Sequence, residues 1–459
     1  MNKILTVAGL TWKSAFRYRL FWIMVILLVG AVVGLPLMLK DDGTAKGLTQ
    51  ILLTYTLTAV STLLGLATLW LSCGTLAKDV EECQMQVVSV KPIARWQIWL
   101  GKWLGILSLN AVLLALSGAA VFSLLQWRAN RLPADQQAIL RNDIFVARAS
   151  ARRPPVDLAP MVDDIFKKNV KRLDSLSEFQ IAEIKQQILG RLTAEYTEVP
   201  PGVRRRWGVD LHTLRDSLRD KPLQLRVKFH AANPNPDAQY TMLWVVGPTN
   251  SNEQAQIAEK LPPDSFQEFQ IPPNLLDDHG ILWVDVINPE NTALTFPMED
   301  GFELLYPEST FPVNFVRGMA VIFCWLTLLA SMGLAAASYL SFPVAAFVSM
   351  ALLIMGLSSG TIGSVVEQGT ITGYDPAKSG YGHSPVDIVM VPVFRGAFKV
   401  INLVQSFSPI DFLSSGRSIT WGQLGLAVAQ IVLLLGGFFC VLGMIFFTRR
   451  ELATAQGNT

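Results

Sequence analysis

Apolar runs without a charged residue alternate with charged segments along the chain, and the lengths of these runs predict its fold. A bilayer core about 30 Å thick requires roughly 20 apolar residues per helix. Runs of at least that length are Leu20–Leu39, Gly47–Ala77, Trp103–Trp127, Gly318–Val366 and Ser418–Thr448. Gly318–Val366 is long enough for two helices, with a break at Pro343, because proline ends or kinks a helix. The pattern therefore predicts six transmembrane helices, the second of them over about Gln50–Cys73.

The polar region between the third and fourth predicted helices changes its period near residue 220. Residues 133–220 are highly charged, and apolar positions such as Ile165, Leu173 and Phe179 recur at steps typical of amphipathic helices. In residues 221–309, short alternating segments are separated by Asn-Pro and Gly-Pro turns, as in a small β-sandwich. These segments are Leu223–Phe229, Thr241–Val246, Phe266–Ile271, Gly280–Ile287 and Gly301–Tyr306.

The predicted fold is an α-helical integral membrane protein with six transmembrane helices and an inserted α+β domain. Residues 1–127 hold an interfacial helix and transmembrane helices 1–3, with a loop at residues 74–102. Residues 128–313 form the extracytoplasmic domain, helical over 133–220 and β-rich over 221–309. Residues 314–459 hold transmembrane helices 4–6 and an interfacial or re-entrant segment at 385–417.

Two further segments are amphipathic, and each allows a second interpretation. Asn2–Arg19 is basic with interspersed apolar residues, as expected of a helix on the inner membrane surface, or else of an extension of the first span. Ile388–Val404 is apolar except for Arg395 and Lys399, which share one helical face. An interfacial or re-entrant element fits this segment, whereas a seventh spanning helix would place the C-terminus outside.

The distribution of basic residues favours cytoplasmic N- and C-termini by the positive-inside rule. With the N-terminus inside, the short inner segments contain ten basic residues and the short outer loops contain six. The inner residues are Lys3, Lys13, Arg17, Arg19, Lys78, Lys91, Arg95, Lys102, Arg449 and Arg450, and the outer ones are Lys40, Lys46, Lys378, Arg395, Lys399 and Arg417. Arg128, Arg131 and Arg317 would flank spans on the outside and oppose this orientation.

Composition excludes several other classes of protein. Only 16% of the residues are charged, well below the roughly 25% of soluble domains. The net charge of +2, without a basic cluster, gives no reason to expect a nucleic acid partner. The four cysteines lie in or beside apolar segments at spacings unsuited to zinc, so we expect neither a metal site nor a disulfide framework.

Catalytic motifs are missing from the chain. The only Gly-Lys pair, Gly101-Lys102, is followed by Trp103, so there is no phosphate-binding loop. There is no G-x-S-x-G, H-E-x-x-H or C-x-x-C motif, and the predicted spans contain no carboxylate for ion-coupled transport. We expect a protein that is not an enzyme and has no energy source of its own.

The loop between the second and third spans carries the most specific pattern. Thr75–Gln86 is followed by Ser89–Gly105, which contains Lys91-Pro92, Arg95 and Gly101-Lys102. These segments resemble the corresponding loop of ABC-2-type transporter permeases. Ser408–Arg417 is similar to the segment before the last helix in the NosY-like branch of that family.

The resemblance implies a permease subunit of the bacterial inner membrane that works in export with a second permease subunit and a separate ATPase subunit. ATP and Mg²⁺ would bind to that ATPase, so no cofactor is expected in this chain. The resemblance also implies that Asp79, Glu81 and Glu82 contact the ATPase, with Lys91, Pro92 and Arg95 shaping the turn. The interfacial elements would include Arg395, Lys399, Pro409, Asp411 and Arg417.

Two other interpretations stay open at this stage. The loop at 74–102 could be a solvated connector whose charges only fix the topology. The whole chain could be a membrane-anchored binding or assembly protein that acts through its extracytoplasmic β-rich domain. The insertion at 128–313 gives reason to expect an extracytoplasmic partner or gate.

Overall fold

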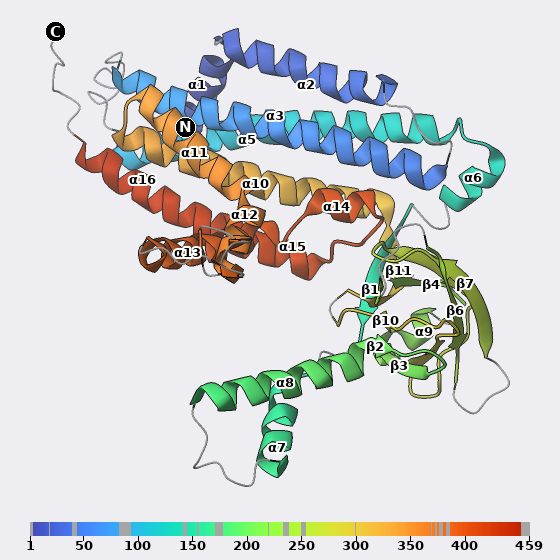
Figure 1. Ribbon diagram of the computed structural model, residues 1–459. Coiled ribbons are helices and arrows are strands. Elements are labelled where there is room, and N and C mark those ends of the chain that lie inside the picture. The colour runs from blue at the N-terminus through green and yellow to red at the C-terminus, as the bar shows by residue number, and fades with distance from the viewer. Residues whose placement is uncertain are drawn as a thin grey trace. The chain divides into compact units, whose positions relative to one another are not determined.

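The computed structural model of the chain separates into two compact units (Figure 1). The first comprises Met1–Ala147 and Ser309–Thr459, and the second comprises Arg148–Glu308. The described residues are 3–17, 19–38, 44–81, 93–140, 145–153, 156–169, 178–218, 220–232, 238–248, 254–298, 300–368, 370–371, 374–375, 380–381 and 386–450.

Long apolar helices make up the first unit. Among the described residues, five helices are long and apolar enough to cross a membrane, and a bent pair makes a sixth if it is counted as one span. The five are α2 (Arg19–Met38), α3 (Ala45–Glu81), α5 (Arg95–Ala129), α10 (Phe311–Tyr339) and the continuous α15 (Trp421–Ala427), π-helix η4 (Val428–Gly436) and α16 (Gly437–Arg449). The bent pair is α11 (Phe342–Leu357) and α12 (Ser359–Gln368), which meet at 62°. These helices fit a multi-pass membrane protein.

The long helices extend beyond the apolar runs that predicted them. Helix α3 has 37 residues, about 55 Å at 1.5 Å per residue, so the prediction of a helix over about Gln50–Cys73 was too short. Its last turns carry charged residues that are held by contacts with other helices, which a hydropathy pattern does not reveal. The predicted break near Pro343 is confirmed, because α10 ends at Tyr339 and α11 begins at Phe342.

Helix α10 lies at the centre of the bundle, where it packs against α3, α5, α11 and α16 (Figure 1). In the apolar stretch of α10, 61% of the residues are buried, whereas only 22% are buried in that of α2. Small residues allow the close contacts. A Cβ atom at Gly333 would lie 3.0 Å from the Cβ of Ser72, and one at Gly443 would lie 2.9 Å from the Trp99 ring. Such small-residue contacts are typical of helix packing in membranes.

Helix α1 (Lys3–Arg17) is separate from α2 and packs along the N-terminal half of α5. Val7, Thr11 and Ala15 form its buried face. The contact is close because α5 presents two glycines one turn apart. A Cβ atom at Gly101 would lie 2.6 Å from that of Val7, and one at Gly105 would lie 2.7 Å from that of Thr11.

The segment between α12 and the last long helix contains two shorter helices. Helix α13 (Asp387–Gln405) packs against α12, where the ring of Phe398 lies close to Gly363. It carries Arg395 and Lys399 on its exposed surface and is not among the membrane-length helices. Helix α14 (Pro409–Ser414) follows and packs against α3 and α10.

The second unit is built on two four-stranded sheets whose inner faces share one hydrophobic core. One sheet has the order β1-β11-β4-β8 and the other β3-β9-β6-β7. Leu225 and Leu304 from the first sheet and Trp244 and Val284 from the second are all buried in this core. The strands are β1 (Val146–Arg152), β3 (Arg204–Asp210), β4 (Leu223–Val227), β6 (Tyr240–Val246), β7 (Ala255–Leu261), β8 (Gln267–Ile271), β9 (Ile281–Ile287) and β11 (Phe302–Thr310).

All five predicted strand segments are strands in the structure, but the expected helical region also contains strands. Strands β1 and β3 lie within residues 133–220, so an all-helical interpretation of that region was wrong. The sequence of β3 is Arg-Arg-Arg-Trp-Gly-Val-Asp. Its three arginines make the segment polar, so the buried positions Trp207 and Val209, two residues apart, do not stand out as a strand pattern. It forms a strand because it pairs with β9 along its whole length.

The described part of the second unit contains helices in the predicted helical region, where Ile165 is partly buried, while Leu173 lies outside the described residues. Helix α7 (Ala159–Asn169) packs against α8 (Glu178–Thr197). Leu158, Val162 and Leu192 form a small core between them, separate from the core of the sheets.

Candidate functional site

The predicted ATPase-contacting loop connects the end of α3 to the start of α5. The structure describes Asp79, Glu81 and Arg95, while Glu82, Lys91 and Pro92 lie outside the described residues. The contacts of the described residues show how both ends of the loop are held within the first unit.

Lys102 joins α5 to α3. Its ammonium group donates a hydrogen bond to the backbone carbonyl of Thr75 at 2.7 Å and contacts the Asp79 carboxylate at 2.5 Å. The Lys102 side chain is 8% exposed and that of Asp79 is 24% exposed. Asp79 therefore neutralises a buried charge inside the bundle, a role that was not predicted for it.

Glu81, in the last turn of α3, contacts the start of α11. One of its carboxylate oxygens accepts a hydrogen bond from the backbone N–H of Phe342 at 2.8 Å. The first N–H groups of a helix have no partner within the helix, and a carboxylate placed there is stabilising. Glu81 is itself exposed, so it links the end of α3 to the start of α11 at the surface of the unit.

Arg95, the first residue of α5, caps the C-terminus of α16. Its guanidinium group donates to the backbone carbonyls of Thr448 at 3.0 Å and Arg450 at 2.7 Å. Arg450 in turn donates to the carbonyls of Ala337 and Ser338, in the last turn of α10, at 3.4 and 3.3 Å. Cationic groups at helix C-termini satisfy carbonyls that lack partners and complement the helix dipole.

Together these contacts form what we call the helix-end cluster: Asp79, Glu81, Arg95, Lys102 and Arg450. It links the ends of α3, α5, α10, α11 and α16 through hydrogen bonds to side chains and backbone. No substrate or nucleophile is suggested by this geometry. What the arrangement can do is transmit a displacement of either end of the 82–92 loop to several helices at once.

The predicted interfacial residues near the last span form a second group. Pro409 is buried at the start of α14, and Asp411 accepts a hydrogen bond from the Ser408 hydroxyl. The backbone carbonyl of Arg417 accepts a hydrogen bond from the Asn314 amide of α10 at 2.7 Å. Leu413 packs so closely on Gly318 of α10 that a Cβ there would lie 2.5 Å from its methyl carbon. Arg395 and Lys399 lie on α13, outside this group.

Sequence reasoning missed Lys102, Arg450, Asn314 and Arg317 as positioning residues. Lys102 and Arg450 were counted as basic residues that indicate topology, and Lys102 also as part of the pattern of the 74–102 loop. A usable signal existed for Lys102, since a lysine followed by an unbroken apolar helix needs a partner. Asn314 and Arg317 stand at the edge of an apolar run, and nothing local indicates that they bind the segment before the last helix.

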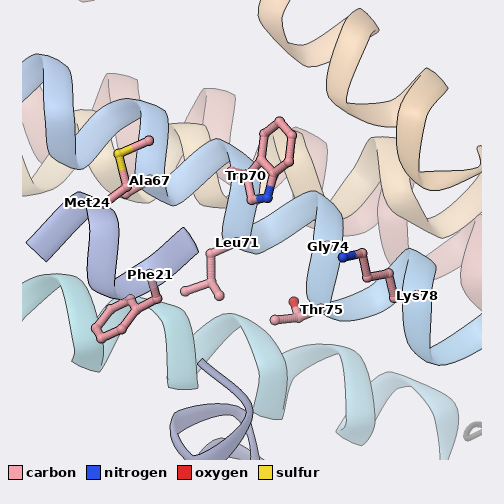
Figure 2. A pocket seen from close by; sticks show the side chains of 8 residues that line it. All are labelled: Phe21, Met24, Ala67, Trp70, Leu71, Gly74, Thr75 and Lys78. Carbon is pink, nitrogen blue, oxygen red and sulfur yellow. The ribbon is translucent and has the colours of Figure 1, made fainter. Parts of the chain in front are cut away.

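A small pocket lies between α2 and α3 (Figure 2). Phe21 from α2 and Trp70, Leu71 and Thr75 from α3 line it, with Lys78 at its border. Its volume is about 30 Å³, room for about two water molecules. In this conformation the pocket is too small for a ligand much larger than that.

Charged ladders on the two sheets account for most of the ion pairs of the second unit. Glu303, almost fully buried, contacts Arg152 and Arg226, and Arg226 also pairs with Glu268 at 3.7 Å. On the other sheet, Asp285 binds Arg204 and Arg206. Burial raises the pKa of Asp285, but hydrogen bonds and charges from both arginines outweigh it and hold the pKa below its usual value. These pairs lie between neighbouring strands and have a structural role.

Comparisons with known proteins leave the family open. Within the described part of the chain, no group of three or more His, Cys, Asp or Glu side chains could hold a metal ion. No family model, curated protein or solved structure matches the chain. The resemblance of the 74–102 loop to ABC-2-type permeases therefore stays a prediction.

Proposed function

We propose that this chain is the permease subunit of an ATP-driven export system of the ABC-2 type, working with a separate ATPase subunit. One observation carries the proposal: both ends of the 82–92 loop are linked to the ends of helices distant in sequence. Glu81 contacts α11, and Arg95 contacts α16, which is linked to α10 through Arg450. A simple solvated connector would not need such anchoring.

In this mechanism the permease does mechanical work and no covalent chemistry. Closure of two ATPase subunits around ATP and Mg²⁺ would displace the 82–92 loop, with Glu82, Lys91 and Pro92 in the contact region. The displacement would pass through the helix-end cluster to α10, the helix at the centre of the bundle. A second permease subunit would complete the pathway between the two bundles.

The topology that fits this proposal has six spans, with α11 and α12 together forming the fifth. The termini then lie in the cytoplasm of a bacterial cell, and the protein lies in the inner membrane. Basic residues of α1, the end of α3 and the end of α16 would face the cytoplasm, in agreement with the positive-inside rule. The unit Arg148–Glu308 would lie outside, where it could bind an extracytoplasmic partner.

Affinity purification of the tagged chain from native membranes, followed by mass spectrometry, tests the proposal. We expect a stoichiometric soluble subunit with a phosphate-binding loop, and its loss in the charge-reversed variant Glu82→Lys. Glu195→Lys is the matched control, because it makes the same charge reversal at an exposed residue of α8, away from the 82–92 loop and the helix-end cluster.

The opposite result has a clear meaning. A chain that folds normally but repeatedly purifies without an ATPase, or only with extracytoplasmic proteins, would exclude the transporter proposal. The membrane-anchored binding protein would then be the better description, with its activity in the β-rich unit.

A further inference from the structure

Arg317 is a buried cation on α10. It is 7% exposed, and one of its terminal nitrogens donates to the backbone carbonyl of Ile419 at 3.0 Å. Within the part of the chain that the structure describes, its Nε has no hydrogen-bond partner and no carboxylate pairs with it. Burying a charge without a partner is strongly unfavourable, so a missing anion is the simplest physical explanation.

A second buried hydrogen-bond donor lies in the segment before α15, which Arg317 contacts through Ile419. Ser418 is 5% exposed, and its hydroxyl has no hydrogen-bond partner among the described residues. It lies between Arg417 and Ile419, whose backbone groups are hydrogen-bonded to Asn314, one turn before Arg317 on α10. A hydroxyl and a guanidinium group are the donors that commonly bind phosphate oxygens.

The surroundings place this site where an apolar helix begins. The Arg317 guanidinium stacks on the ring of Trp421 at 4.5 Å, and Trp421, the first residue of α15, is 66% exposed. An equivalent pair, Arg131 stacked on the partly exposed Trp127 at 3.8 Å, lies at the end of α5. The two regions share this end of the bundle, because Phe122 of α5 contacts Phe311 and Phe315 of α10. Exposed tryptophans at helix ends are typical of the headgroup level of a bilayer.

We propose that Arg317 and Ser418 form a binding site for the phosphate of an anionic phospholipid, with Trp421 against its glycerol and upper acyl region. Free inorganic phosphate offers the same oxygens, but the exposed tryptophan at the start of an apolar helix favours a lipid. The site is independent of the proposed transport function, since it uses none of the residues of the helix-end cluster.

Native mass spectrometry of the full-length, delipidated protein with added dioleoyl phosphatidylglycerol tests this proposal. We expect one lipid per chain to be retained under conditions that remove the others, together with a rise in the unfolding temperature. Arg317→Met should reduce the affinity by about tenfold or more, the effect of losing a charge-assisted contact. The same variant should unfold at an unchanged or higher temperature without lipid, because the unpaired charge is gone.

Two controls and two ligands make the outcome decisive. Arg131→Met removes an exposed arginine that stacks on a tryptophan at the same end of the bundle. This variant should retain the lipid. If Arg317→Met does not fold, Arg317→Lys keeps the charge without the planar fork and should still bind more weakly than wild type. Equal retention by wild type and the Arg317 variants would overturn the proposal. So would a full stabilising effect from inorganic phosphate, or from dioleoylglycerol, which lacks the phosphate.

Discussion

Lys102 illustrates how a single charge is accommodated inside an apolar helix. Its partners are Asp79 and the carbonyl of Thr75, both on α3 and one helical turn apart. Removing one member of a buried ion pair usually costs about 3–5 kcal/mol, because the other charge stays buried without compensation. Because Asp79 is partly exposed, we expect the cost of removing its charge to lie at the lower end of that range.

Asp79→Asn should therefore lower the free energy of unfolding by about 3 kcal/mol. This loss should appear as a clear fall in the unfolding temperature of the purified protein. The double variant Asp79→Asn with Lys102→Met should recover most of the loss, since it leaves no buried charge. Differential scanning fluorimetry on wild type, Asp79→Asn, Lys102→Met and the double variant measures both effects. If the double variant is as unstable as the sum of its single changes, the two residues do not act as a pair.

Asp285 predicts a pH dependence for the second unit. Its folded-state pKa is lowered from the usual value of 3.8, so its contribution to stability is complete above that pH and is lost as the pH falls through the folded pKa. The pKa of Asp277 shifts in the same direction: burial raises it, but hydrogen bonds from the Ile281 and His279 amides and the Trp283 ring outweigh burial and hold it below its usual value.

We expect Asp285→Asn to lower the unfolding temperature at neutral pH and to flatten its decline between about pH 4 and pH 2. Tryptophan fluorescence of the full-length protein reports this, because Trp207 and Trp244 lie in the core of the sheets. Asp278→Asn, at a fully exposed side chain, is the matched control and should leave the curve unchanged. An identical acid profile for wild type and Asp285→Asn would contradict the assignment.

At the scale of elements, the contact of α1 with α5 depends on two glycines. A larger side chain at Gly101 would overlap with Val7 and with the backbone carbonyl of Ile4, which would lie 2.9 Å from the new Cβ. Overpacking of this kind costs about 1–3 kcal/mol or displaces the neighbouring element.

Gly101→Leu should consequently detach α1 from α5. In a background without native cysteines, Thr11→Cys would be protected from a maleimide reagent, because Thr11 is buried at this contact. Adding Gly101→Leu should expose it to rapid labelling, whereas Gly30→Leu should not, since Gly30 has no neighbouring atom within 4 Å of a new Cβ. Continued protection in the Gly101→Leu variant would show that α1 does not depend on this contact.

Sequence periodicity predicted most elements but not the contacts between their ends. The apolar runs identified the long helices because hydrocarbon-length apolar helices have few alternative structures. Periodicity failed at β3, where pairing with β9 overrides a polar composition, and at the C-terminal end of α3, where Lys102 stabilises charged turns. Of the predicted site, Asp79, Glu81 and Arg95 lie together at one end of the bundle, but their partners on α10, α11 and α16 depend on the tertiary fold.

At the scale of the whole molecule, the proposed function makes the first unit a mechanical device and the second an extracytoplasmic module. The helix-end cluster is the connection that makes this division testable. If the 82–92 loop receives the ATPase, then residues within that loop must lie in direct contact with it during the transport cycle.

Site-specific photo-crosslinking in native membranes is the most direct measurement of this claim. A photoreactive amino acid at Gln84 or Gln86 should capture a soluble subunit that carries a phosphate-binding loop, while the same group at Leu433, on the exposed surface of the last long helix, should not. The account predicts a single crosslinked ATPase from the loop positions. Crosslinks only to lipid or to other membrane proteins, from both loop positions and with the chain correctly folded, would contradict it.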